Sequence, residues 1–340
     1  MTQQRSSKLV RAAQALSASL IWAIPLSMAL GLVSGLLADL SLLQVLVLPL
    51  TMLMVYPMLV NVRLRDAFGP ADAKPVTVAM LINFLALPVL AWALARAFFS
   101  SDAGLFVGMV LAGLFPTSGM TISWTGFAKG NVGAAVKMTV VGLIAASLLA
   151  PFYLKALAGR VVPVDLVGVL STVALVVALP LVAAQLTRIV LVRRYGGERF
   201  KSRIAPVFPG MSVLGVLGIV FVAVGLKAEM IVARPSLTFA ILVPLLIFYL
   251  VNFALSTLVG RVLFGRGDAI ALVYGTVMRN LSIALGVAIA SFGPEAALVL
   301  AAGYIVQVQA AAWYVRLTDR LFGPVAATAA EAGGAASARA

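Results

Sequence analysis

Long uncharged runs alternate with short polar segments along almost the whole chain. Each run is long enough to cross the hydrocarbon core of a bilayer as an α-helix. The pattern predicts ten spans, at about 19–38, 42–62, 76–99, 104–128, 132–157, 164–190, 205–226, 236–263, 268–291 and 295–317. The first run has no convincing cleavage site, so we expect a retained span and not a signal peptide. The predicted fold class is an all-α polytopic membrane protein with ten transmembrane helices.

Composition supports this assignment. The chain has 340 residues, of which 63% are hydrophobic and 11% charged, and its mean hydropathy is +1.11. No soluble domain of this size keeps so much apolar surface from water. The net charge of +14 is compatible with nucleic-acid binding, but the basic residues lie in short loops between spans. We therefore expect no nucleic-acid partner. The expected partners are the lipid bilayer and a small-molecule solute, and the pattern specifies no oligomeric state.

The distribution of lysine and arginine predicts the orientation in the membrane. The two terminal segments and every second loop hold eighteen of the 25 Lys and Arg residues, and the remaining loops hold five. Such an excess marks the cytoplasmic side. We therefore expect an integral protein of the bacterial plasma (inner) membrane with both termini in the cytoplasm.

The chain contains no cysteine and no histidine, which excludes disulfides, thiolate sites and imidazole proton relays. It also lacks a Walker loop, a dinucleotide fingerprint and a metal-ligand cluster. An intramembrane enzyme is disfavoured because no deep carboxylate is available as a base. A sensor is disfavoured because no soluble output domain is attached. We expect no enzymatic activity, no cofactor and no metal site.

One apolar segment, at about 104–128, cannot form a continuous helix. Pro116 removes a backbone hydrogen bond, Gly119 loosens the next turn, and Thr117 and Ser118 can cap a new helix start. Interrupted backbone at bilayer depth is tolerated where protein buries it or where it lines a cavity. Such interruptions mark the ligand site in many secondary transporters. The segment predicts half of a substrate site, with a proline kink that binds nothing as the alternative.

The two halves of the chain resemble each other. Asn83-Phe84 recurs as Asn252-Phe253, and two further segment pairs have nearly the same offset. This pattern predicts an inverted repeat of five spans, with chance matches in apolar sequence as the alternative. The predicted units are a basic cytoplasmic tail (1–18), a first repeat (19–158), a second repeat (159–320) and a disordered tail (321–340). The repeat places the counterpart of the first break at 275–282.

At these two stretches the sequence resembles the bile acid/arsenite/riboflavin transporter superfamily, which includes the bile acid:sodium symporters and the arsenite-efflux permeases. The most specific residues are Pro116-Thr117-Ser118-Gly119-Met120, Trp124 and Lys129-Gly130-Asn131. The resemblance covers about 20–320. It implies a core domain of spans 3–5 and 8–10 and a panel domain of spans 1, 2, 6 and 7. It also implies that broken fourth and ninth helices cross at the substrate site.

The sequence departs from this superfamily at several functional positions. Thr117 stands where the arsenite permeases have a cysteine, and their ninth-span carboxylate corresponds to Ser282. Gly275 and Arg279 stand where the symporters supply sodium ligands, although neutral oxygens of Thr117, Ser118, Thr121, Ser123 and Asn280 remain. We therefore expect weak or no sodium coupling. The alternatives are a metalloid permease without the thiol and a sodium-coupled organic-anion symporter.

Arg279 is the expected centre of the site, because an ionisable residue within a span is a functional candidate by default. With the helix start after Pro116 it would attract an anion. The alternative is that backbone carbonyls or a hydrated vestibule satisfy it. The expected substrate-binding residues are Pro116, Thr117, Ser118, Gly119, Thr121, Arg279, Asn280 and Ser282. Secondary candidates are Asn83, Asn252 and Lys137, of which Lys137 could instead extend to the membrane surface. The predicted function is secondary transport of a small anion by alternating access.

Overall fold

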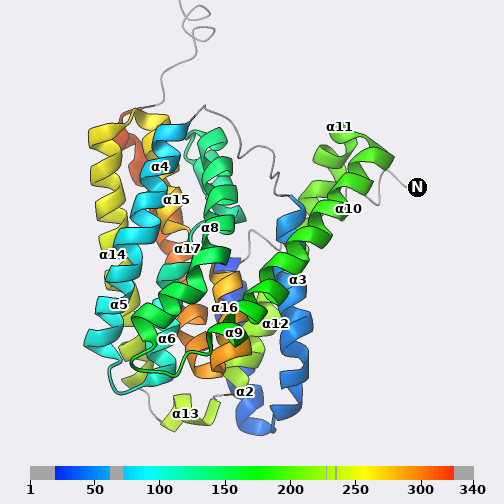
Figure 1. The fold of residues 1–340 in the computed structure, drawn as a ribbon, viewed down its shortest axis with the longest axis vertical. Helices are drawn as coiled ribbons and strands as arrows, with labels where there is room; N and C mark the ends of the chain where they lie inside the picture. Colours follow the sequence, from blue (N-terminus) through cyan, green and yellow to red (C-terminus); the bar gives the residue numbers. More distant parts are fainter. Residues whose placement is uncertain (1–19, 62–71, 227, 234–235, 325–340) are drawn as a thin grey trace, which may run out of the picture.

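A computed structural model of the chain describes residues 20–61, 72–226, 228–233 and 236–324, and all regular structure in them is helical (Figure 1). The predicted N-terminal tail and most of the predicted C-terminal tail lie outside the described residues. The first half contains α2 (Leu20–Leu37), η1 (Ser41–Leu46), α3 (Val47–Val60), α4 (Ala73–Leu81), η3 (Ile82–Ala86), α5 (Leu87–Phe98), α6 (Ala103–Leu114), α7 (Gly119–Phe127) and α8 (Val132–Ala158). The second half contains α9 (Leu166–Val173), η4 (Ala174–Ala178), α10 (Leu179–Tyr195), α11 (Gly197–Arg199), η5 (Phe200–Ile204), η6 (Ala205–Val207), α12 (Phe208–Gly225), α13 (Ala228–Ala233), α14 (Ser236–Leu263), α15 (Arg266–Val277), α16 (Leu281–Phe292) and α17 (Pro294–Phe322).

Eight helical segments of the described chain are long and apolar enough to cross a membrane. The number is nine if α6 and α7, which bend by 57° at their junction, form one broken span. A shorter apolar helix, Trp22–Leu37, lies where the first span was predicted. The structure therefore supports a helical protein of eight to nine candidate spans, and the count of ten remains a prediction.

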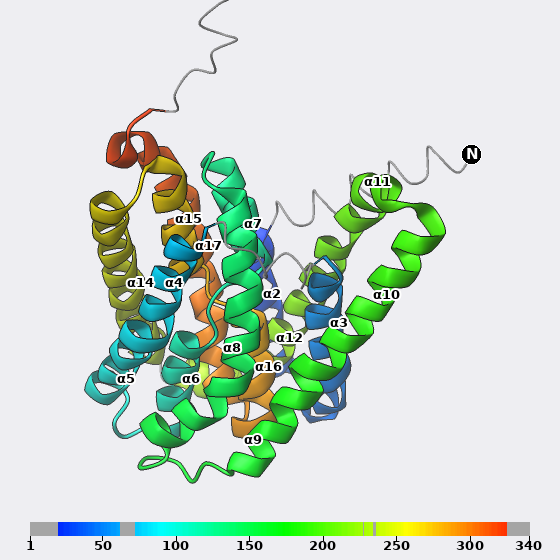
Figure 2. The same ribbon diagram turned by 45° about the horizontal axis from the view of Figure 1, so that its top comes forward.

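The helices form two packed groups (Figures 1 and 2). In one group α12 packs against α2 and α3, and α10 packs against α3. In the other, α6 packs against α5 and α17, α14 against α15, and α16 against α17. Figure 2 shows α10 and α3 on the opposite side of the molecule from α14 and α5.

Glycines allow the close helix contacts of the first group. A Cβ on Gly215 of α12 would lie 2.4 Å from the backbone nitrogen of Met54 in α3. One on Gly31 of α2 would lie 2.5 Å from the carbonyl oxygen of Phe221 in α12. Lipid tails are as apolar as leucine, so close van der Waals contact across small residues replaces the hydrophobic effect as the force between these helices.

The spans differ in how deeply they lie inside the protein. The segment Arg266–Phe292 joins α15 and α16, and 94% of its most apolar stretch of 18 residues is buried. In Leu166–Tyr195, which joins α9, η4 and α10, the share is 28%. The predicted ninth span is therefore surrounded by protein, whereas the predicted sixth faces outward along most of its length.

The basic segment 191–204, which lies between the predicted sixth and seventh spans, is helical except at Gly196. Helix α10 continues to Tyr195, and α11 and η5 follow after a turn at Gly196, whose φ is +81°. Arginine and lysine are good helix formers, and their charges reach water from a helix that extends beyond the bilayer core. Charge marks the membrane boundary here but does not end the helix.

Candidate functional site

The first interruption is the non-helical segment 115–118 between α6 and α7. Phe115 and Ser118 both have extended backbone dihedral angles, and Pro116 lies between them. Ser118 is the N-cap of α7: its hydroxyl accepts from the backbone N–H of Met120 at 3.3 Å. The Thr121 hydroxyl accepts from the backbone N–H of Ser118 at 3.1 Å, so the two side chains cap the helix start reciprocally.

The second interruption lies between α15 and α16 and contains no proline. Met278, Arg279 and Asn280 leave the helical conformation, and Asn280 is the N-cap of α16, where its Oδ1 accepts from the backbone N–H of Ile283 at 3.3 Å. The backbone N–H of Arg279 is shared between the carbonyl of Val277 and the side-chain oxygen of Gln307.

The two interruptions touch. The backbone N–H of Asn280 donates to the carbonyl oxygen of Phe115 at 2.8 Å. Both groups belong to residues outside regular helix, so each break provides a partner for the other. Polar backbone within a bilayer is stable when protein satisfies it, and this contact is one way in which the pair of breaks meets that condition.

Arg279 is completely buried, and among the described residues it is the only charged side chain that is. Its guanidinium donates from Nε to the carbonyl of Ala112 at 3.2 Å and from one terminal nitrogen to the carbonyl of Gly113 at 2.5 Å. The other terminal nitrogen donates to Asn83 Oδ1 at 2.5 Å and to the carbonyl of Thr276 at 3.3 Å.

The arginine thus caps the C-terminal end of α6, where carbonyls lack helical partners and the helix dipole is negative. The geometry is that of the alternative in which backbone carbonyls satisfy Arg279. These acceptors are neutral, however, and leave the positive charge uncompensated.

Two asparagines cap the last turn of α15. Asn83, on the π-helical turn η3, donates to the carbonyl of Gly275 at 2.9 Å. Asn252, on α14, donates to the carbonyl of Thr276 at 3.0 Å. Both are fully buried. The structure therefore brings these two secondary candidates to the second break, one from each predicted repeat.

Thr117 adopts a left-handed backbone conformation, with φ of +56°. This is rare for a β-branched residue, because the branched side chain clashes with the backbone. Its hydroxyl donates to the carbonyl of Pro116 at 2.8 Å. A Cβ on Gly142 of α8 would lie 2.7 Å from the hydroxyl oxygen of Thr117. Strained residues of this kind cluster at functional sites.

The other predicted residues lie on several surfaces. Gly119, at the start of α7, faces Met58 of α3, where a Cβ would lie 3.5 Å from the methionine side chain. The Ser282 hydroxyl lies 2.5 Å from that of Tyr304. Lys137 forms an ion pair with Asp72 at 3.1 Å.

Gln307 of α17 was not among the predicted site residues, although it has a central position. Its Oε1 accepts from the backbone N–H of Arg279 at 2.8 Å and from the Tyr249 hydroxyl at 2.9 Å. Its Nε2 donates to the carbonyl of Arg279 at 3.3 Å. Gln307 and Gln309 are the two side-chain amides of this largely apolar span, and they were the available signal, because a buried amide needs partners.

The described residues contain no group of three or more His, Cys, Asp or Glu side chains that could hold a metal ion. At the two breaks the available ligands are backbone carbonyls, hydroxyls and side-chain amides. These groups can bind a solute by hydrogen bonds, and the site as described carries one fixed positive charge.

Comparison with known proteins adds independent information. Residues 47–234 match the family model of the Sodium Bile acid symporter family. The "Uncharacterized protein YbaS" of Bacillus subtilis is 26% identical over 72% of this chain and 79% of its own length. The "Arsenical-resistance protein Acr3" of Corynebacterium glutamicum is 24% identical over 83% of this chain and 82% of its own length. The "Probable sodium/metabolite cotransporter BASS2, chloroplastic" of Oryza sativa subsp. japonica is 29% identical over 55% of this chain and 42% of its own length.

Proposed function

The chain belongs to the Sodium Bile acid symporter family and is a secondary transporter, not an enzyme, and we propose that it carries a small anionic solute by alternating access. In this proposal the chain has ten spans in two inverted repeats, with both termini in the cytoplasm. The substrate binds where the broken fourth and ninth spans cross.

The observation that carries the proposal is the contact between the breaks beside a buried, uncompensated charge. Asn280 and Phe115 share a backbone hydrogen bond, and Arg279 lies between the interrupted helices. Helix α7 begins four residues after Phe115 and helix α16 one residue after Asn280, and helix N-termini carry partial positive charge. Because no described acidic side chain is buried, we infer that the electrostatic potential at the crossing is positive and favours an anion.

In this proposal Arg279 acts on the substrate through its charge, because its donors are used by Ala112, Gly113 and Asn83. The groups that contact the substrate are those at the breaks that are partly exposed. Gly119 and Ser282 lie in the first turns of α7 and α16 and are partly exposed, in contrast to the buried Thr117 and Ser118. Pro116, Thr117, Ser118, Thr121 and Asn280 set the backbone that presents these turns.

The proposed movement occurs between the two packed groups of helices. The panel is α2, α3, α9, α10 and α12, and the core contains the broken spans. Gly119 faces Met58 of the panel, so a shift of one group against the other would open the start of α7 to one side of the membrane at a time. This is the rocking of a helix bundle against a fixed site that inverted-repeat transporters use.

We propose weak or no sodium coupling. A second cation near Arg279 is repelled by about 4 kcal/mol at a separation of about 4 Å and an effective dielectric constant of about 20. The described residues supply no carboxylate at the breaks that would offset this repulsion.

A binding screen on the purified protein tests the proposal. The melting temperature is measured with organic anions, inorganic oxyanions and neutral analogues, each with sodium or with potassium as the only cation. We expect stabilisation by one class of anion and the same midpoint concentration in both salts. Stabilisation by neutral analogues alone would refute the anionic substrate. A steep sodium dependence would refute weak coupling and favour a sodium-coupled organic-anion symporter.

Metalloid efflux is the second candidate, because the Acr3 relative covers most of this chain. Expression in an arsenite-sensitive host tests it. We expect no protection, since the chain has no cysteine and the thiol position corresponds to Thr117. Strong protection that is lost in Thr117→Ala would show that a hydroxyl can replace the thiol.

A further inference from the structure

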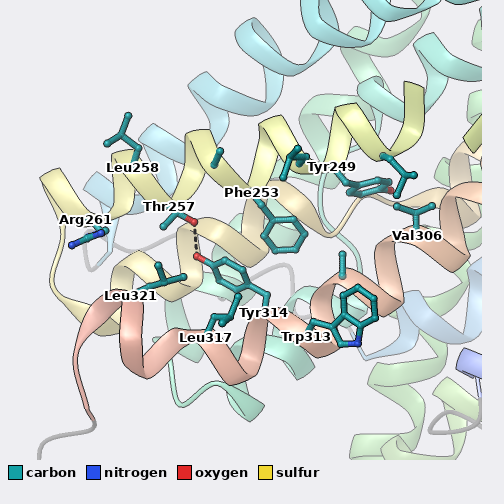
Figure 3. A pocket seen from close by; sticks show the side chains of 14 residues that line it. Tyr249, Phe253, Thr257, Leu258, Arg261, Val306, Trp313, Tyr314, Leu317 and Leu321 are labelled. Carbon is teal, nitrogen blue, oxygen red and sulfur yellow. Dashed lines mark hydrogen bonds between the residues drawn. The ribbon is translucent and has the colours of Figure 1, made fainter. Parts of the chain in front are cut away.

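A groove on the outer face of the molecule runs between α14 and α17 (Figure 3). It encloses about 570 Å³ and is lined by residues of both helices, from Leu246 and Val306 at one end to Arg261 and Leu321 at the other. The two helices run in the same direction, because Tyr249 pairs with Gln307 and Thr257 with Tyr314. We propose that this groove binds one acyl chain of an anionic phospholipid, whose headgroup lies at Arg261.

The chemistry of the wall favours hydrocarbon. Three hydroxyl groups belong to its lining, and each is already used: Tyr249 donates to Gln307, and Thr257 and Tyr314 bond to each other at 2.5 Å. The groove therefore offers no free hydroxyl to a polar solute. Large apolar side chains form its rim, of which Trp313 is 67% and Leu250 71% exposed. Figure 3 shows the Thr257 and Tyr314 side chains directed at each other across the groove.

The length of the groove fits one leaflet. From Leu246 to Arg261 the rise along α14 is about 22 Å at 1.5 Å per residue. Half of a bilayer including its headgroup region measures about 20–22 Å. The groove thus extends from the membrane surface to about the middle of the bilayer, as a single acyl chain does.

Arg261 supplies the charge for the headgroup. It lies in the last turn of α14, is exposed, and forms no ion pair or hydrogen bond with another described residue. An arginine at this depth matches a phosphate bidentately, and the pairing is charge-assisted. A zwitterionic headgroup also carries a phosphate, but its attached cation offsets the attraction, so we expect selectivity for a lipid with net negative charge.

The inner end of the groove is connected by hydrogen bonds to the residues of the second break. Tyr249 lines the groove and donates to Gln307, which holds both the N–H and the carbonyl of Arg279. A bound chain would therefore restrain the side chain that supports the interruption. This connection is independent of which solute the transporter carries.

Native mass spectrometry of delipidated protein tests the site, with phosphatidylglycerol and phosphatidylcholine of identical chains. We expect one phosphatidylglycerol per protein, bound more tightly than phosphatidylcholine. Arg261→Gln should weaken phosphatidylglycerol about tenfold or more, the typical loss for a charge-assisted hydrogen bond, and leave phosphatidylcholine unchanged. The matched control is Arg193→Gln, an exposed arginine on α10 outside the groove, which should change neither.

Filling the groove with large side chains provides a second test of the lipid site. Ala310→Trp and Ala254→Trp enter from opposite walls, and each should abolish retention of both lipids while the melting temperature without lipid stays near that of the parent. Two variants are used so that misfolding of one leaves the test intact. Equal retention of the two lipids by the parent, or full retention by the filled variants, would overturn the proposal. A protein dimer that both tryptophans abolish would assign the groove to a second copy and would also overturn it.

Discussion

Replacing Arg279 separates two roles that one side chain combines. In the structure its fork holds the end of α6, and in our proposal its charge attracts the substrate. Arg279→Gln removes the charge and is too short to reach the same carbonyls. Arg279→Lys retains the charge but lacks the planar fork. The pair of variants therefore distinguishes an effect of hydrogen-bond geometry from an effect of charge.

The expected loss of stability follows from the groups left without partners. In Arg279→Gln the carbonyls of Ala112 and Gly113 lose their donors, and each buried unsatisfied group costs about 1–3 kcal/mol. Removing a buried charge recovers part of this, because its desolvation cost disappears. We expect a net loss of about 2 kcal/mol, which for a chain of 340 residues lowers the melting temperature by about 3 °C.

The expected loss of affinity follows from Coulomb's law. A unit charge acting over about 8 Å at an effective dielectric constant of about 20 contributes about 2 kcal/mol, which corresponds to roughly 30-fold in affinity. Arg279→Gln should lose this factor and Arg279→Lys should retain most of it. Both variants should lose stability, since neither reproduces the fork.

The assay measures the melting temperature and the anion affinity of each variant in the same detergent, below the melting temperature of the less stable variant. Arg193→Gln is the control for loss of a surface charge. If Arg279→Gln binds the anion within twofold of the parent, the charge is not used for binding. If Arg279→Lys loses as much affinity as Arg279→Gln, the substrate needs the guanidinium itself and the idea of attraction at a distance is refuted.

Three further predictions concern the surroundings of the breaks. Gln307→Leu leaves the Tyr249 hydroxyl and the carbonyl of Arg279 without partners, while the Arg279 N–H keeps the Val277 carbonyl, so it should cost about 2 kcal/mol or more, seen as a lower melting temperature. Gly142→Ala places a Cβ 2.7 Å from the Thr117 oxygen and should weaken both stability, by about 1–3 kcal/mol, and anion binding. Gly126→Ala, with nothing nearer than 3.8 Å, is its control, and equal effects of the two would contradict the crowding argument. Lys137→Gln removes a partly exposed ion pair to Asp72, so both quantities should stay near those of the parent, and a large loss of binding would return Lys137 to the site.

The candidate spans and the first break could be predicted because their causes are local. An apolar run of sufficient length forms a span in any context, and Pro116 interrupts a helix through its own ring. The cap at Ser118 follows from the same reasoning, since a short polar side chain can accept from its own helix start. The helical course of α10 to Tyr195 was missed because charge was taken as the end of a helix.

The partners of Arg279 could not be predicted, because most of them are backbone carbonyls. Ala112 and Gly113 carry no side-chain pattern that marks them as acceptors, and they lie more than 160 residues away along the chain. Asn83 was singled out as a repeat marker and as a secondary site candidate without a named partner, whereas in the structure it bonds both Arg279 and Gly275. The left-handed backbone of Thr117 depends on the neighbouring α8 and has no local signal.

The long sequence separation of these partners has a consequence for biosynthesis. A span with arginine at its centre is inserted at a cost of about 2.5–3.5 kcal/mol when it stands alone. The groups that satisfy Arg279 on α6 and η3 are translated before it, whereas Gln307 is translated after it. The nascent ninth span therefore gains most of its compensation by docking onto an N-terminal half that has already assembled, and a fragment beginning after that half should insert poorly.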